Sequence, residues 1–111
     1  MKKEVSYKDL YFMAREIVKK KSMNKVMSIS DKEERSLLFE YLIRSSLEMK
    51  YAEIKEKIKN LEEQKKDMFI ILTKLHLLGS SMHFFYATLY KKDFHKIMGL
   101  FKEIEKEIKK C

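Results

Sequence analysis

The residues of this chain that could perform chemistry gather near one point, where Ser80 and Ser81 lie between His76 and His83. A serine nucleophile needs a histidine base, an acid that orients this base, and donors that stabilise an oxyanion. A metal site needs further ligands at a suitable spacing, but no Glu-x-x-His, His-x-x-x-His or nearby cysteine accompanies these histidines or His95. We therefore expect no catalytic residue, no metal site and no cofactor, and a protein that is not an enzyme.

A second group of chemically distinctive residues is basic. No acidic residue lies between Glu16 and Asp31. Cations in such a run can neutralise the phosphates of a nucleic acid, and Tyr7, Tyr11 and Phe12 nearby offer aromatic surface. A solvated helix end explains the same residues and is the interpretation that we prefer. The candidate phosphate contacts are Arg15, Lys19, Lys20, Lys21 and Lys25.

The overall charge leaves several kinds of partner open. The 111 residues include 25 basic and 17 acidic side chains, which gives a formal charge of +8. This balance allows nucleic acid, an anionic membrane or an acidic protein as partner. Cys111 is the only cysteine and no signal-peptide core follows Met1, so we expect a cytoplasmic protein. Lys74 and two histidines interrupt the apolar residues 68–90, so we do not expect insertion into a membrane.

The composition predicts an all-α fold. The chain has no proline and only two glycines, whereas a sheet protein of this size needs more turn residues. Apolar residues at helical spacing predict a first helix over residues 7–21, preceded by a capping box that begins at Ser6. A second capping box, Ser30–Glu33, starts a helix that neither proline nor glycine interrupts before Gly79.

The predicted architecture depends on a turn at Gly79–Ser81. Glycine suits the end of a helix and serine suits the start of the next one. Residues 50–78 and 82–110 have equal lengths and would pair antiparallel, and a heptad seam from Leu47 to Leu75 is typical of such a pair. We therefore expect a single domain over residues 1–111, a small helical bundle built on a long antiparallel helical hairpin.

The apolar residues around the expected turn exceed what a hairpin partner can cover. We therefore expect a non-enzymatic protein-interaction module, such as a small adapter, inhibitor or assembly subunit, that forms a homodimer or binds another protein. The first alternative is a basic nucleic-acid-associated protein. The second is a cytoplasmic immunity-type or peripheral membrane-associated helical bundle. The predicted interface comprises Phe69, Ile70, Leu77, Phe84, Phe85, Tyr86 and Tyr90.

Overall fold

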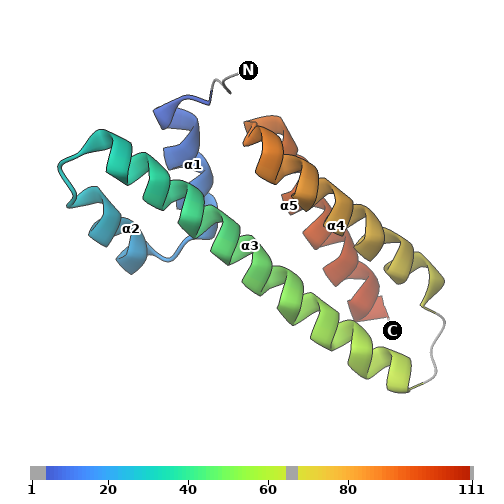
Figure 1. Cartoon of the computed structure of the whole chain (residues 1–111). Coiled ribbons are helices and arrows are strands. Elements are labelled where there is room, and N and C mark those ends of the chain that lie inside the picture. Colours follow the sequence, from blue (N-terminus) through green and yellow to red (C-terminus); the bar gives the residue numbers. More distant parts are fainter. Residues whose placement is uncertain (1–4, 65–67, 111) are drawn as a thin grey trace. The chain divides into compact units, whose positions relative to one another are not determined.

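The computed structural model describes residues 5–64 and 68–110, and within these ranges the chain forms five helices and no strand. The all-α helical fold is therefore confirmed. The chain divides into two compact units, residues 1–49 and 50–111, and the third helix contributes to both. The expectation of one domain stays a prediction. The helices are α1 (Tyr7–Ile17), α2 (Lys20–Met27), α3 (Lys32–Glu63), α4 (Phe69–Thr88) and α5 (Lys91–Lys110) (Figure 1).

The first unit holds α1, α2 and the N-terminal part of α3. The amide of Asp9 donates a hydrogen bond to Ser6 Oγ at 3.1 Å, so α1 begins at the predicted cap. The predicted extension to residue 21 is wrong, because α1 ends at Ile17 and a separate helix, α2, follows. In a continuous helix Met23 would lie on the face opposite Leu10, yet both are buried. The change of direction allows both helices to bury their apolar sides.

The start of α3 differs from the prediction by one residue. Asp31 Oδ1 accepts a hydrogen bond from the Glu33 amide at 2.9 Å, so the capping side chain is Asp31 and not that of Ser30. Further along α3, the buried ring of Phe39 lies 5.5 Å from the Tyr7 ring and 6.1 Å from the Tyr11 ring, between centroids. Both tyrosines are half-buried, so their rings stabilise this unit more than they offer a surface for bases.

The second unit consists of α3 from Lys50 onward together with α4 and α5. Helices α4 and α5 lie side by side and antiparallel (Figure 1). Lys50 Nζ is 3.5 Å from Glu105 Oε1 and 5.3 Å from the ring centroid of Phe101, which places this part of α3 against α5. The unit has an apolar core formed by Ile54, Ile58, Met68, Ile71, Leu78, Met82, Phe85, Leu89, Phe94, Ile97, Phe101 and Ile104.

The predicted turn at Gly79–Ser81 is wrong. Helix α4 continues through this segment, and neither glycine has a positive φ. The physical reason is the register of the apolar residues on the two sides of the glycine. Ile71, Leu78, Met82 and Phe85 follow one another at spacings of seven, four and three, so they share one buried face only if the helix continues.

The predicted arms of the hairpin change accordingly. The helix expected to run from Ser30 toward residue 78 ends at Glu63 in the structure, and α4 begins at Phe69. Lys65, the one break in the predicted heptad seam, lies outside the described residues. The antiparallel pair is therefore formed by α4 with α5, and not by residues 50–78 with 82–110.

The chain reverses direction at Leu89, which ends α4 in the left-handed conformation with φ of 56°. Glycine is the usual residue in this conformation. Here the Leu89 side chain is buried and its amide donates to the Phe85 carbonyl at 2.6 Å. The Thr88 hydroxyl donates to Asp93 Oδ2 at 2.7 Å, which connects the end of α4 to the first turn of α5. This turn lacks glycine and is stabilised by side-chain contacts, so the local sequence does not indicate it.

Alanine substitutions at the two glycines should have different effects on stability. A Cβ at the exposed Gly99 in α5 would meet nothing within 4 Å. Gly99→Ala should raise the free energy of unfolding by about 0.5–1 kcal/mol, because alanine has less backbone freedom in the unfolded state. Gly79→Ala is the matched control and should gain less or lose stability, because its Cβ would lie 3.2 Å from the Tyr51 hydroxyl. Urea unfolding measures both, and equal gains would contradict the close approach of Tyr51.

Candidate functional site

Helix α4 carries large apolar side chains on its exposed side. Phe69 is 75% exposed, Ile70 57%, Leu77 51% and Phe84 60%. Single exposed apolar residues are common on soluble proteins, whereas several on one side of one helix form a patch of the kind that often serves as an interaction surface. We call this surface the exposed face of α4, and it consists of Phe69, Ile70, Leu72, Thr73, His76, Leu77, Ser80, His83, Phe84 and Ala87.

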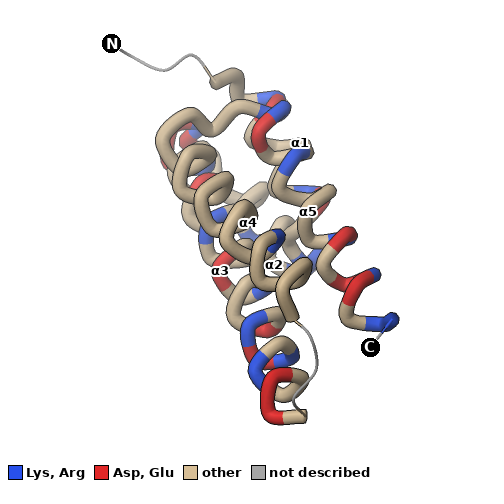
Figure 2. The backbone as a smooth tube through the Cα atoms, turned by 90° about the vertical axis from the view of Figure 1, so that its right-hand side faces the viewer, with Lys and Arg blue, Asp and Glu red and all other residues tan. Residues whose placement is uncertain are grey.

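The exposed face of α4 contains no lysine, arginine, aspartate or glutamate. In Figure 2, α4 is the tube that follows the grey segment after α3, and it is tan apart from one blue stretch. The one charged residue of the helix, Lys74, is half-buried, and its Nζ donates to Glu103 Oε1 of α5 at 3.1 Å. The positive charge of α4 is therefore engaged with α5 and does not contribute to the exposed face.

Helix α5 provides a comparison within the same unit. Its buried apolar residues recur at spacings of three and four, and its exposed positions, beginning with Lys91 and Lys92, are mostly charged. This is the usual pattern of a surface helix. The two helices meet through their buried faces, where the ring centroids of Phe85 and Phe94 are 5.8 Å apart. The apolar residues on the exposed face of α4 are additional to this contact, and the packing of α4 on α5 does not explain them.

The structure separates the residues of the predicted interface. Phe85 is fully buried, so we correct the prediction for this residue and assign it to the core. Because α4 continues through Gly79, Phe85 turns toward α5 and away from the surface. Tyr86 is half-buried with its ring 6.2 Å from that of Phe85, and Tyr90 is exposed after the end of α4. The members that lie on the exposed face of α4 are Phe69, Ile70, Leu77 and Phe84.

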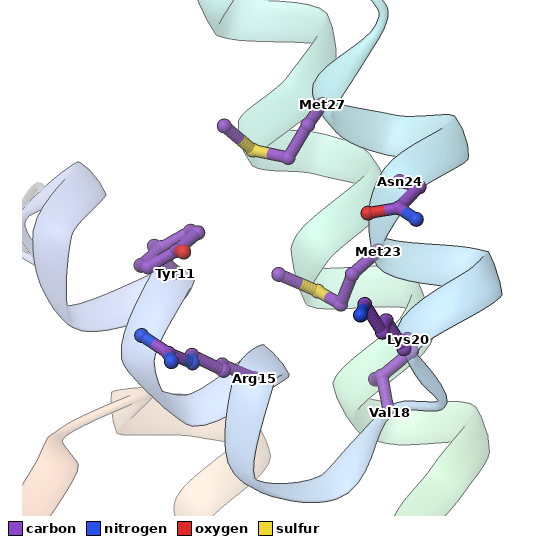
Figure 3. Close-up of a pocket in the computed structure, with 7 residues that line it drawn as sticks. All are labelled: Tyr11, Arg15, Val18, Lys20, Met23, Asn24 and Met27. Atoms are coloured by element: carbon purple, nitrogen blue, oxygen red, sulfur yellow. The ribbon is translucent and has the colours of Figure 1, made fainter.

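Two of the predicted phosphate contacts lie at one hollow between α1 and α2, with a volume of about 490 Å³. Arg15 extends beside Tyr11 on α1, and Lys20 lies across the hollow on α2 (Figure 3). Met23 and Met27 point from α2 into the space between the helices. The hollow therefore brings two cations together with two methionines, and its lining residues are Tyr11, Arg15, Val18, Lys20, Met23, Asn24 and Met27.

The other predicted phosphate contacts lie elsewhere. Lys19 and Lys21 are exposed near the start of α2. Lys25 lines a different hollow, of about 270 Å³, whose other lining residues are mostly apolar and belong to α2, α3 and the segment between them. The cations are thus distributed over two hollows and the open surface, which is a weaker arrangement for a phosphate than one convergent cluster.

The serines and histidines with catalytic potential do not lie at a turn, as the sequence predicted, but on helices. His76 and His83 lie on the exposed face of α4, and His95 is exposed on α5. Ser80 and Ser81 lie within α4. Across residues 5–64 and 68–110, no three His, Cys, Asp or Glu side chains are grouped so that they could hold a metal ion. In the same part of the chain, no helix has the length and apolar character needed to cross a membrane.

The sequence interpretation missed two features of the surface. The first is the set of small residues, Thr73, Ser80 and Ala87, that separate the large ones along the exposed face of α4. Their seven-residue period is visible in the sequence if the helix continues through Gly79. The second lies in the first unit, where Leu37 and Tyr41 on α3 are about two-thirds exposed. Their four-residue spacing places them on one side of that helix.

Comparisons of the chain with protein-family models, with curated proteins and with solved structures find no match. The proposals below therefore rest on the surface of the molecule.

Proposed function

We propose that this chain is a non-enzymatic protein-interaction module that acts through the exposed face of α4. It forms a homodimer or binds another protein, and it works in the cytoplasm as a small adapter, inhibitor or assembly subunit. The observation that carries this proposal is an uncharged helical face in a chain of which 38% of the residues are charged. The lone cysteine supports the cytoplasmic location.

The size of the exposed face supports a specific interface. A large apolar side chain offers on the order of 200 Å² when it is fully exposed. The five large residues of this face are each about half to three-quarters exposed, so together they offer on the order of 500 Å². They are Phe69, Ile70, Leu72, Leu77 and Phe84. Two faces of this size would remove about 1,000 Å² from water, which is near the lower limit for a specific protein–protein interface. The hydrophobic effect favours such burial, and no charged group on this face has to be desolvated.

A capture experiment tests the proposal. The full chain serves as bait for soluble extract of its own cells, and its self-association is measured separately. Leu77→Glu should abolish both self-association and any specific capture, because it introduces a charge at the centre of the exposed face. Leu37→Glu is the matched control, since this leucine is exposed on the first unit. If Leu77→Glu and Leu37→Glu behave like the unmodified chain in both assays, the proposal is wrong.

Nucleic-acid binding is the second candidate function. It is supported by Arg15 and Lys20, which lie at the same hollow, and by the charge of +8. Binding to mixed-sequence DNA or RNA should then fall steeply with salt, and the double change Arg15→Glu, Lys20→Glu should abolish it. A gel-shift series over salt concentration measures this. An unmodified chain that fails to shift either nucleic acid at low salt excludes this candidate.

The third class, an immunity-type or peripheral membrane-associated bundle, is supported by the positive charge alone. Pelleting with anionic vesicles tests membrane association, and neutral vesicles provide the control.

A further inference from the structure

The exposed face of α4 contains a regular alternation of large and small side chains. Its central residues follow the alternating spacing of three and four that is characteristic of a coiled-coil seam. Large and small residues alternate along this seam, so that each kind recurs every seven residues. In chain order the seam reads Ile70, Thr73, Leu77, Ser80, Phe84 and Ala87.

This alternation is self-complementary when two copies of α4 run antiparallel. With a two-fold axis between positions 78 and 79, every large residue of the seam meets a small residue of the second copy, in the pairs Ile70 with Ala87, Leu77 with Ser80, and Phe84 with Thr73. In a parallel pair, identical residues would face each other, so large residues would collide and small residues would leave gaps. The pattern therefore favours one orientation.

A hollow in the second unit lies where this register needs space. It has a volume of about 190 Å³ and is lined by Ser80, Ser81 and Phe84 of α4 and by Asp93 and Lys96 of α5. In the antiparallel register, Leu77 of the second copy arrives opposite Ser80. The leucine side chain therefore meets a small residue beside this concave surface.

We propose that two copies of this chain associate through antiparallel pairing of their α4 helices about a two-fold axis near positions 78 and 79. This inference rests on the proposed function and names the partner of the exposed face of α4 as a second copy. The absence of charge from this face matters especially for self-pairing, because any charge there would meet its own copy nearby. A partner of another sequence would not require the large-to-small match of the seam with itself.

Cysteine cross-linking reads the orientation directly. In a Cys111→Ser background, Ser80→Cys would place the two thiols about 4.5 Å apart along the helix axis of the antiparallel pair, at ~1.5 Å per residue. Ala87→Cys would place them about 25 Å apart along the axis. Both positions are exposed on α4, so both variants should fold. A short thiol-reactive linker should therefore give a cross-linked dimer with Ser80→Cys and leave Ala87→Cys without a cross-link.

The outcomes separate this inference from the proposed function. Equal cross-linking of Ser80→Cys and Ala87→Cys would overturn the antiparallel register. A mass of 13.5 kDa at high micromolar concentration, with no cross-link at either position, would overturn self-pairing. In that case the proposed function survives if a complex with another protein is captured and Leu77→Glu abolishes it. Both fail if no such complex forms.

Salt dependence gives an independent readout of the same pairing. Each copy carries a charge of +8, so two copies repel each other at low ionic strength. Self-association through an uncharged face should strengthen as salt screens this repulsion. Binding to nucleic acid would show the opposite trend. Self-association that weakens with salt would contradict pairing through α4.

Discussion

Phe85→Ala is expected to lower the free energy of unfolding by about 3–5 kcal/mol, the usual cost of removing a buried phenylalanine ring. Phe85 is fully buried, and its ring packs against that of Phe94 on α5. The cost comes from the lost burial of the ring and from the cavity that alanine leaves between the two helices. Stabilities of small domains are typically about 5–15 kcal/mol, so this single change removes a large share. Urea unfolding followed by circular dichroism measures the effect.

Phe84→Ala is the matched control, because Phe84 precedes Phe85 on the same helix and is 60% exposed. Measured at concentrations where the chain is monomeric, it should change the free energy of unfolding by less than about 1 kcal/mol. If Phe85→Ala prevents folding, Phe85→Leu keeps most of the volume and should still cost more than Phe84→Leu. A larger loss at Phe84 than at Phe85 would mean that the two residues exchange roles and that α4 is rotated about its axis.

Phe84→Glu is expected to weaken association through the exposed face of α4 on the order of 1,000-fold. A central aromatic residue of an interface commonly contributes about 2 kcal/mol, or about 30-fold, and in a two-fold symmetric dimer the change occurs once in each copy. The glutamate would also bring a carboxylate onto a face that carries no lysine or arginine, and the ammonium of Lys74 is already engaged by Glu103. Sedimentation equilibrium over a concentration series measures the change.

Two further variants make this prediction specific. Phe84→Leu keeps an apolar side chain at the seam and should retain most of the association. Leu37→Glu adds the same charge to the first unit and should leave association through α4 unchanged. Equal dissociation constants for Phe84→Glu and the unmodified chain would show that this face takes no part in association.

The fold class and the starts of α1 and α3, the latter to within one residue, could be predicted from the sequence because they depend on local chemistry. Ser6 caps α1 through a contact three residues away, and no proline disrupts any helix. The turn could not be predicted in the same way. Gly79–Ser81 has the composition of a turn, but the in-phase burial of residues on both sides of it stabilises a continuous helix. The observed reversal at Leu89 depends on burial and on the bond from Thr88 to Asp93, which are tertiary contacts.

The candidate site also combines a feature that the sequence predicts with one that depends on tertiary contacts. That residues 68–90 hold more apolar surface than two helices require is visible in the sequence. Which of those residues remain exposed depends on the rotation of α4 about its axis, and this rotation follows from its packing against α5. The wrong turn at Gly79 therefore also leads to the wrong assignment of Phe85 to the surface, whereas Phe85 shares the buried face with Met82. Phe69 and Phe84 are exposed because their side chains point away from that buried face, and their part in an interface stays a prediction.

Chemical modification of the three histidines tests most directly whether the exposed face of α4 is covered in solution. His76 and His83 lie on this face and His95 lies on α5, so the third histidine is an internal control within the second unit. Diethylpyrocarbonate labelling, read by mass spectrometry, would compare the unmodified chain with Phe84→Glu at low and high micromolar concentration and in soluble extract. We predict that His76 and His83 of the unmodified chain become protected at high concentration or in extract, that His95 does not, and that Phe84→Glu removes the protection. Equal labelling of all three histidines in both proteins under every condition would contradict a protein-binding role for this face.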